Sequence, residues 1–79
     1  MMLSYEECKK IALDKAKLYN TTMDTAYEIG NDFAFENSKE AWEGVFPCVV
    51  IAESGETMGL WRYLNDMDLT EYDMKEREF

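Results

Sequence analysis

Acidic side chains dominate the chemistry open to this chain. Of its 79 residues, 17 are Asp or Glu, 8 are Lys or Arg and none is His, which gives a formal net charge of −9 at pH 7. Paired carboxylates divide the acid and base roles in glycosidases and hold divalent cations in metal sites. In so short and acidic a chain, however, close pairs arise by chance, so pairing alone does not indicate a site.

One acidic segment is similar to the start of a calcium-binding EF-hand loop. Asp66, Asp68 and Thr70 have the required spacing, but Glu71 occupies the sixth loop position, where glycine is needed for the turn. Arg77 occupies the twelfth position, where a bidentate glutamate is needed. We therefore expect no metal site and interpret these acids as solvated surface.

Nucleophilic chemistry also lacks its usual parts. The absence of histidine removes the Ser-His-Asp and Cys-His machineries, and no glycine-rich phosphate-binding motif is present. Cys8 and Cys48 lie forty positions apart, which matches neither a redox pair nor a zinc site. We expect two reduced cysteines with at least one packed in the core, and the alternative is a disulfide formed in an oxidising compartment. The chain is thus predicted to have no catalytic residues, no cofactor and no enzymatic activity.

The charge also bears on partners and location. Residues 1–19 hold four lysines and three acids, whereas residues 20–79 hold four basic and fourteen acidic side chains. Nucleic acids and anionic membranes are bound by basic patches, so neither is an expected partner. The first residues lack the signal-peptide pattern of a basic segment followed by an apolar one. No apolar run is long enough to span a bilayer, so we predict a cytoplasmic location.

A binding patch is predicted in the second half of the chain. Protein interfaces are enriched in tryptophan, tyrosine and arginine at the positions that contribute most to affinity. Trp61, Arg62 and Tyr63 are expected on an edge strand beside an acidic segment. The candidate partner-binding residues are Trp61, Arg62, Tyr63, Asp66, Asp68, Glu71 and Asp73.

The elements that must position these residues begin with a helix. Ser4 and Glu7 fit a capping box, and apolar residues recur at helical spacing over residues 5–19. Asn20 tolerates the left-handed conformation in which helices often end. An amphipathic helix lying on a sheet is therefore expected.

Two hairpins are expected after the helix. Apolar and polar residues alternate before and after Gly30-Asn31, a turn signal, and a β-branched apolar run precedes a second turn at residues 53–56. The predicted strands are residues 23–29, 32–36, 47–52 and 57–63.

Two segments are open to more than one interpretation. Residues 38–44, with Trp42, fit one helical turn or a loop. Residues 65–79 fit a short helix opened by Thr70 and Asp73, a fifth strand, or a partly disordered tail. The resulting prediction is a single α+β domain over residues 1–79, in which an N-terminal helix packs on a four-stranded antiparallel sheet.

The order of elements over residues 4–62 resembles the small bacterial immunity protein 35 family. The segments that carry the resemblance are Phe33-Ala34-Phe35-Glu36-Asn37-Ser38-Lys39-Glu40, Pro47-Cys48-Val49-Val50 and Glu53-Ser54-Gly55-Glu56. The chain departs from the family pattern at Asn31-Asp32 and Val45-Phe46, and its last turn is also similar to one in PepSY-type modules. The resemblance implies a non-catalytic protein that binds a toxin, and it transfers no binding residues.

The sequence is compatible with three functions. The first is a binding protein whose acidic surface, chiefly from residues 53–79, engages a basic protein partner. The second is a ligand-binding or regulatory domain in which the open sheet face, with Trp61, Tyr63 and Tyr27, holds a small molecule or pairs in a homodimer. The third is mimicry of nucleic-acid phosphates by regularly spaced carboxylates.

Overall fold

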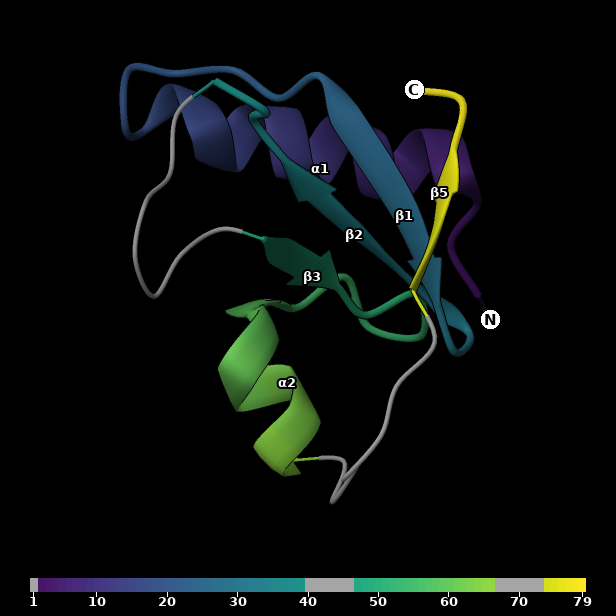
Figure 1. Cartoon of the computed structure of the whole chain (residues 1–79). Helices are drawn as coiled ribbons and strands as arrows, with labels where there is room; N and C mark the ends of the chain where they lie inside the picture. The colour runs from purple at the N-terminus through teal and green to yellow at the C-terminus, as the bar shows by residue number, and fades with distance from the viewer. Residues whose placement is uncertain (1, 40–46, 67–73) are drawn as a thin grey trace.

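The computed structural model describes residues 2–39, 47–66 and 74–79. One long helix lies behind a five-stranded antiparallel sheet, and a short helix lies at one end of the sheet (Figure 1). In chain order, the elements are α1 (Tyr5–Lys17), β1 (Thr25–Ile29), β2 (Asp32–Glu36), β3 (Cys48–Val50), β4 (Thr57–Gly59), α2 (Leu60–Asp66) and β5 (Met74–Arg77). The fold is therefore of the α+β class, as predicted.

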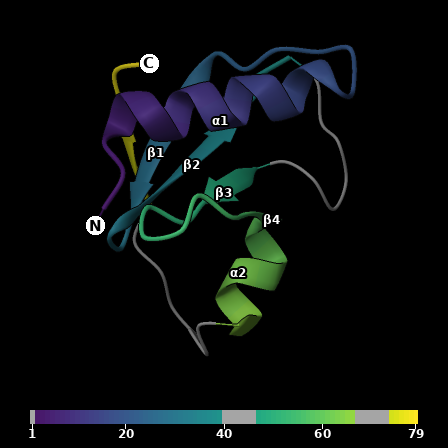
Figure 2. The ribbon, with the colours of Figure 1, turned by 180° about the vertical axis from the view of Figure 1, so that it is seen from behind.

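Helix α1 begins at the predicted capping box. The Glu7 amide donates to Ser4 Oγ at 3.2 Å, and the Ser4 amide donates to Glu7 Oε1 at 3.1 Å. Its buried residues are small, namely Cys8, Ala12 and Ala16, so the helix approaches the sheet closely (Figure 2). The helix ends at Lys17, two residues earlier than predicted, and Asn20 adopts the left-handed conformation with φ of 56°.

The sheet contains one strand more than predicted. Its order is β4-β3-β2-β1-β5, with every neighbouring pair antiparallel. The predicted hairpin of β1 and β2 is present, with Gly30 in its turn at φ of 57°. The additional strand, β5, pairs with the free side of β1, so the end of the chain returns to the first hairpin. Four residues carry too little periodicity to predict such a long-range pairing.

The predicted strand over residues 57–63 is a second correction. The strand stops at Gly59, and helix α2 starts at Leu60. Leu60, Tyr63 and Leu64 are buried because the spacing i, i+3, i+4 places them on one side of this helix. Tertiary packing therefore decided between a strand of period two and a helix.

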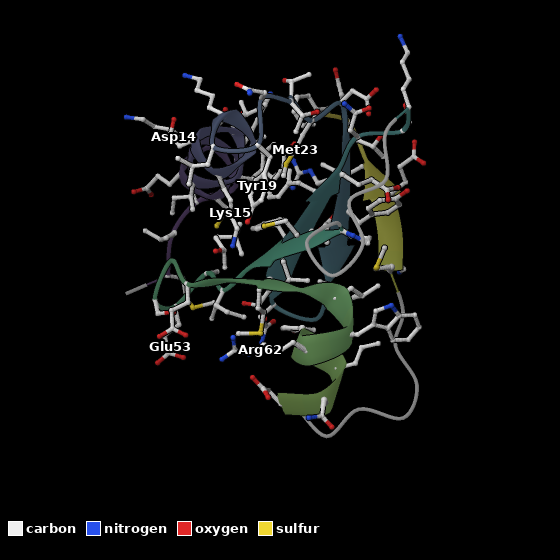
Figure 3. The ribbon with its side chains drawn as sticks, turned by 90° about the vertical axis from the view of Figure 1, so that its left-hand side faces the viewer. Asp14, Lys15, Tyr19, Met23, Glu53 and Arg62 are labelled. Atoms are coloured by element: carbon white, nitrogen blue, oxygen red, sulfur yellow. The ribbon has the colours of Figure 1, made fainter. Side chains whose placement is uncertain are left out.

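The sheet is buried differently on its two faces. On the α1 face, Phe35, Cys48 and Val50 pack with the helix, and both cysteines are free and buried. On the opposite face, α2 covers one end, where Ala34 and Val49 pack against its apolar side. Figure 3 shows α1 and α2 as separate layers, with Lys15 reaching from α1 toward the sheet to donate to Thr57 Oγ1 at 2.7 Å. Within the described ranges, no helix has the length and apolar character needed to cross a membrane.

Candidate functional site

Helix α2 carries four of the predicted partner-binding residues. Trp61 is one of them, and its side chain is 74% exposed. Arg62 is also exposed, and its Nε lies 3.5 Å from Asp66 Oδ2, one helical turn away. Asp68, Glu71 and Asp73 lie outside the described residues.

Tyr63 was predicted in the same surface patch, and this is wrong. Its side chain is 3% exposed because α2 turns it toward the sheet. Its hydroxyl donates to Oδ2 of the buried Asp32 at 2.7 Å, while the Ala52 amide donates to Oδ1 at 3.0 Å. Burial is the main cause that raises the pKa of Tyr63 above its ordinary value, and the hydrogen bond to Asp32 is the second cause. Tyr63 is thus a structural link between α2 and β2.

The described part of the predicted patch lies on α2 and not on an edge strand. In Figure 3, Arg62 extends from α2 on the side of Glu53 and away from β5. Of the predicted patch, Trp61, Arg62 and Asp66 are exposed on this helix, and none of its residues lies on a described strand.

Strand register sorts the charged side chains between the two faces. Residues directly opposite each other in antiparallel strands share a face. Arg77 lies opposite Ala26 and Lys75 opposite Glu28, which places these four residues on the α1 face. Glu76 lies opposite Tyr27 on the other face.

The face opposite α1 is consequently acidic. The charged strand residues that the structure describes on it are Asp32, Glu36 and Glu76, whereas the α1 face carries both signs. We define the acidic face as Tyr27, Glu36 and Glu76, together with the adjacent Asp24.

Tyr27 is the centre of the acidic face. Its half-buried ring packs against the buried cluster of Ala34 and Val49 under α2, and its hydroxyl donates to Glu36 Oε1 at 2.5 Å. This hydrogen bond, with burial and the charges of Glu36, Glu76 and Asp24, raises the pKa of Tyr27 to about 12. The phenol is therefore neutral at physiological pH, and its acidic neighbours form a concentrated negative field around the ring.

Asp24 is held rigidly at one side of this cluster. Its carboxylate accepts hydrogen bonds from the Ser38 amide at 2.9 Å, from Ser38 Oγ at 2.7 Å and from Thr25 Oγ1 at 2.8 Å. These bonds, the amide bond first, lower the pKa of Asp24, and the nearby Lys39 acts in the same direction. Asp24 therefore stays ionised at a lower pH than an unperturbed aspartate.

An aromatic ring flanked by carboxylates fits a cationic side chain. Carboxylates bind ammonium or guanidinium groups through charge-assisted hydrogen bonds, and an aromatic face attracts the same cations. Sequence reasoning named Tyr27 for the open sheet face but missed Glu36 and Glu76. The alternation of residues 25–36 indicated which of them share a face, but the pairing of β5 with β1 was needed to place Glu76.

Two surface hollows accompany these features. One, of about 590 Å³, lies along the outer side of α1 and is lined by three lysines, two acids and two threonines, so its charge is mixed. The other, of about 480 Å³, touches Asp32, Tyr63, Glu53 and the Gly30 turn. Among the residues with described positions, no three acidic or cysteine side chains are grouped closely enough to hold a metal ion.

No family model, curated protein or solved structure matches this chain.

Proposed function

We propose that this protein is a non-enzymatic binding domain that engages a basic protein partner through the acidic face. A toxin is the kind of partner that the resemblance to the immunity protein 35 family implies. The sequence located the binding surface chiefly in residues 53–79, whereas the acidic face combines β1 and β2 with Glu76 of β5.

The sorting of charge between the two sheet faces carries the proposal. Glu36 and Glu76 flank Tyr27 on one face, whereas Lys75 and Arg77 lie on the other. A basic partner is therefore attracted to one face in preference to the other, which provides orientation as well as affinity. Asp24 and Glu36 are already held by hydrogen bonds, so little ordering of these carboxylates is needed on binding.

The test is binding of a lysine-rich synthetic peptide, measured by isothermal titration calorimetry at low salt and again at high salt. A double substitution, Glu36→Gln with Glu76→Gln, removes two charges from the acidic face while retaining a hydrogen-bond acceptor for Tyr27. At about 0.5–1 kcal/mol for each exposed ion pair, affinity is expected to fall by about five- to thirtyfold.

The matched control is Glu6→Gln with Glu28→Gln, which changes the net charge equally on the α1 side of the molecule. Glu6 lies in the first turn of α1, and Glu28 shares its face with Lys75. We expect this variant to bind the peptide within about twofold of the unmodified protein, since only the long-range field changes. Equal losses in the two variants would mean that binding follows total charge, and the acidic face would then have no specific role.

A further inference from the structure

The outer edge of β5 has backbone groups available for pairing with another strand, whereas the interior strands are paired on both sides. Among the described strands, β5 has β1 on one side and no neighbour on the other. Figure 1 shows it at the edge of the sheet, in front of the N-terminal part of α1. The backbone N–H and C=O groups of an edge strand are a template for one more strand.

The side chains of β5 differ in sign between the two faces. Lys75 and Arg77 lie on the α1 face, where the Arg77 guanidinium is 3.6 Å from the centre of the Tyr5 ring. Glu76 lies on the acidic face beside Tyr27. A strand added at this edge would therefore meet positive charge on one face and negative charge on the other.

This arrangement disfavours a second copy of the chain as the added strand. A two-fold axis perpendicular to the sheet pairs β5 with its copy antiparallel and joins like faces to like faces. When this axis passes through Glu76, Glu76 faces Glu76 of the copy, and Lys75 faces Arg77 of the copy. Like charges opposite each other across strands are destabilising. The edge is thus unsuited to homodimerisation and suited to a strand of the complementary pattern.

We infer that the outer edge of β5 docks an extended segment of a partner protein in which basic and acidic side chains alternate. The basic side chains of that segment lie toward Glu76 and the acidic face, and its acidic side chains lie toward Lys75 and Arg77. The basic half of this pattern rests on the proposed function, whereas the acidic half follows from β5 alone. Charged residues also protect edge strands from aggregation. They repel segments that carry like charges and still admit a segment with the complementary charges.

The experiment compares two peptides of about ten residues, the upper end of common strand lengths. In the first, lysine and glutamate alternate, so an extended peptide has one basic and one acidic side. In the second, the same residues are arranged in pairs, which mixes the signs on both sides. Affinity is measured by calorimetry, and amide hydrogen exchange of residues 74–77 is followed by nuclear magnetic resonance.

Strand addition has a backbone signature that side-chain binding lacks. Alternate amides of β5 should become protected when the alternating peptide binds, because alternate residues direct their N–H groups to the same neighbour. Two further peptides carry N-methyl groups on all lysines or on all glutamates. At least one of them should bind about tenfold more weakly, since methylation removes the donors along one edge of the peptide.

The outcomes separate this inference from the proposed function. Preference for the alternating peptide of about tenfold, with new protection in β5, supports strand docking. Equal binding of both peptides without protection overturns it, while loss of lysine-rich peptide binding on substituting Glu36 and Glu76 still supports the acidic face. If neither the alternating peptide nor the lysine-rich one binds, both proposals are wrong.

Discussion

The hydrogen bond between Tyr63 and Asp32 provides a direct test of how α2 is attached to the sheet. Tyr63→Phe removes only the hydroxyl that donates to Asp32 Oδ2 at 2.7 Å. Both side chains are buried, with exposed fractions of 3% for Tyr63 and 9% for Asp32. The substitution therefore leaves a buried carboxylate oxygen without this donor.

The magnitude follows from the charge and burial of the acceptor. A hydrogen bond to a charged group contributes about 1.5–3 kcal/mol, compared with about 0.5–1.5 kcal/mol for a neutral pair. The hollow that touches both residues admits partial replacement by water, which places the expected loss in the lower half of the charged range. At about 4–8 °C per kcal/mol for a domain of this size, the midpoint of thermal unfolding should fall by about 6–18 °C.

The assay is urea unfolding followed by circular dichroism, with the free energy of unfolding compared between variants. Tyr27→Phe is the matched control, because it deletes the same group from a half-buried site where Tyr27 donates to Glu36. Water can replace that hydrogen bond, so we expect a loss below about 1 kcal/mol. In the presence of Asp32→Asn, Tyr63→Phe should cost only about 1 kcal/mol, since the acceptor is then neutral. A loss below about 0.5 kcal/mol for Tyr63→Phe alone, or one no larger than that of the control, would refute the reasoning.

Three further predictions concern pH, backbone conformation and thiol access. The folded state raises the pKa of Tyr27 from 10.0 to about 12. The contribution of its neutral phenol to the free energy of unfolding is therefore complete below pH 10 and should be lost as the pH rises from 10 to about 12. Urea unfolding at a series of alkaline pH values measures this loss, which should be smaller in Tyr27→Phe. Gly55→Ala should lower stability by about 1 kcal/mol or more, because Gly55 has φ of 79° and an added Cβ would lie 3.3 Å from Leu3 Cδ1. Urea unfolding measures the loss against an alanine substitution at the exposed Glu53 of the same turn. Cys8 and Cys48 are buried, and burial raises the pKa of both thiols, so a disulfide reagent should label them at the rate of unfolding; rapid labelling of the native protein would contradict their placement in the core.

Local features of the fold were readable from the sequence. The Ser4 and Glu7 capping box, the hairpin around Gly30 and the buried β-branched strand β3 all depend on interactions within a few residues. Capping, turn conformation and hydrophobic alternation operate at that range, so their residue patterns are sufficient evidence for the elements.

The start of α2 was decided by packing. Residues 57–63 alternate in a way that also fits a strand, but Leu60, Tyr63 and Leu64 bury more effectively as one side of a helix over Ala34 and Val49. The buried Asp32 gives Tyr63 its hydrogen-bond partner, and that partner is 31 positions away in the chain. Neither condition is visible in a seven-residue window.

By itself, the sequence determined the amount of charge, the absence of histidine, the α+β class and the helix that begins after Ser4. Only the tertiary structure decided where the charge lies. The pairing of β5 with β1 places Glu76 beside Tyr27 and turns Lys75 and Arg77 to the other face. The physical reason is that adjacent residues of a strand point to opposite faces, while the register with a distant strand decides which face each one occupies.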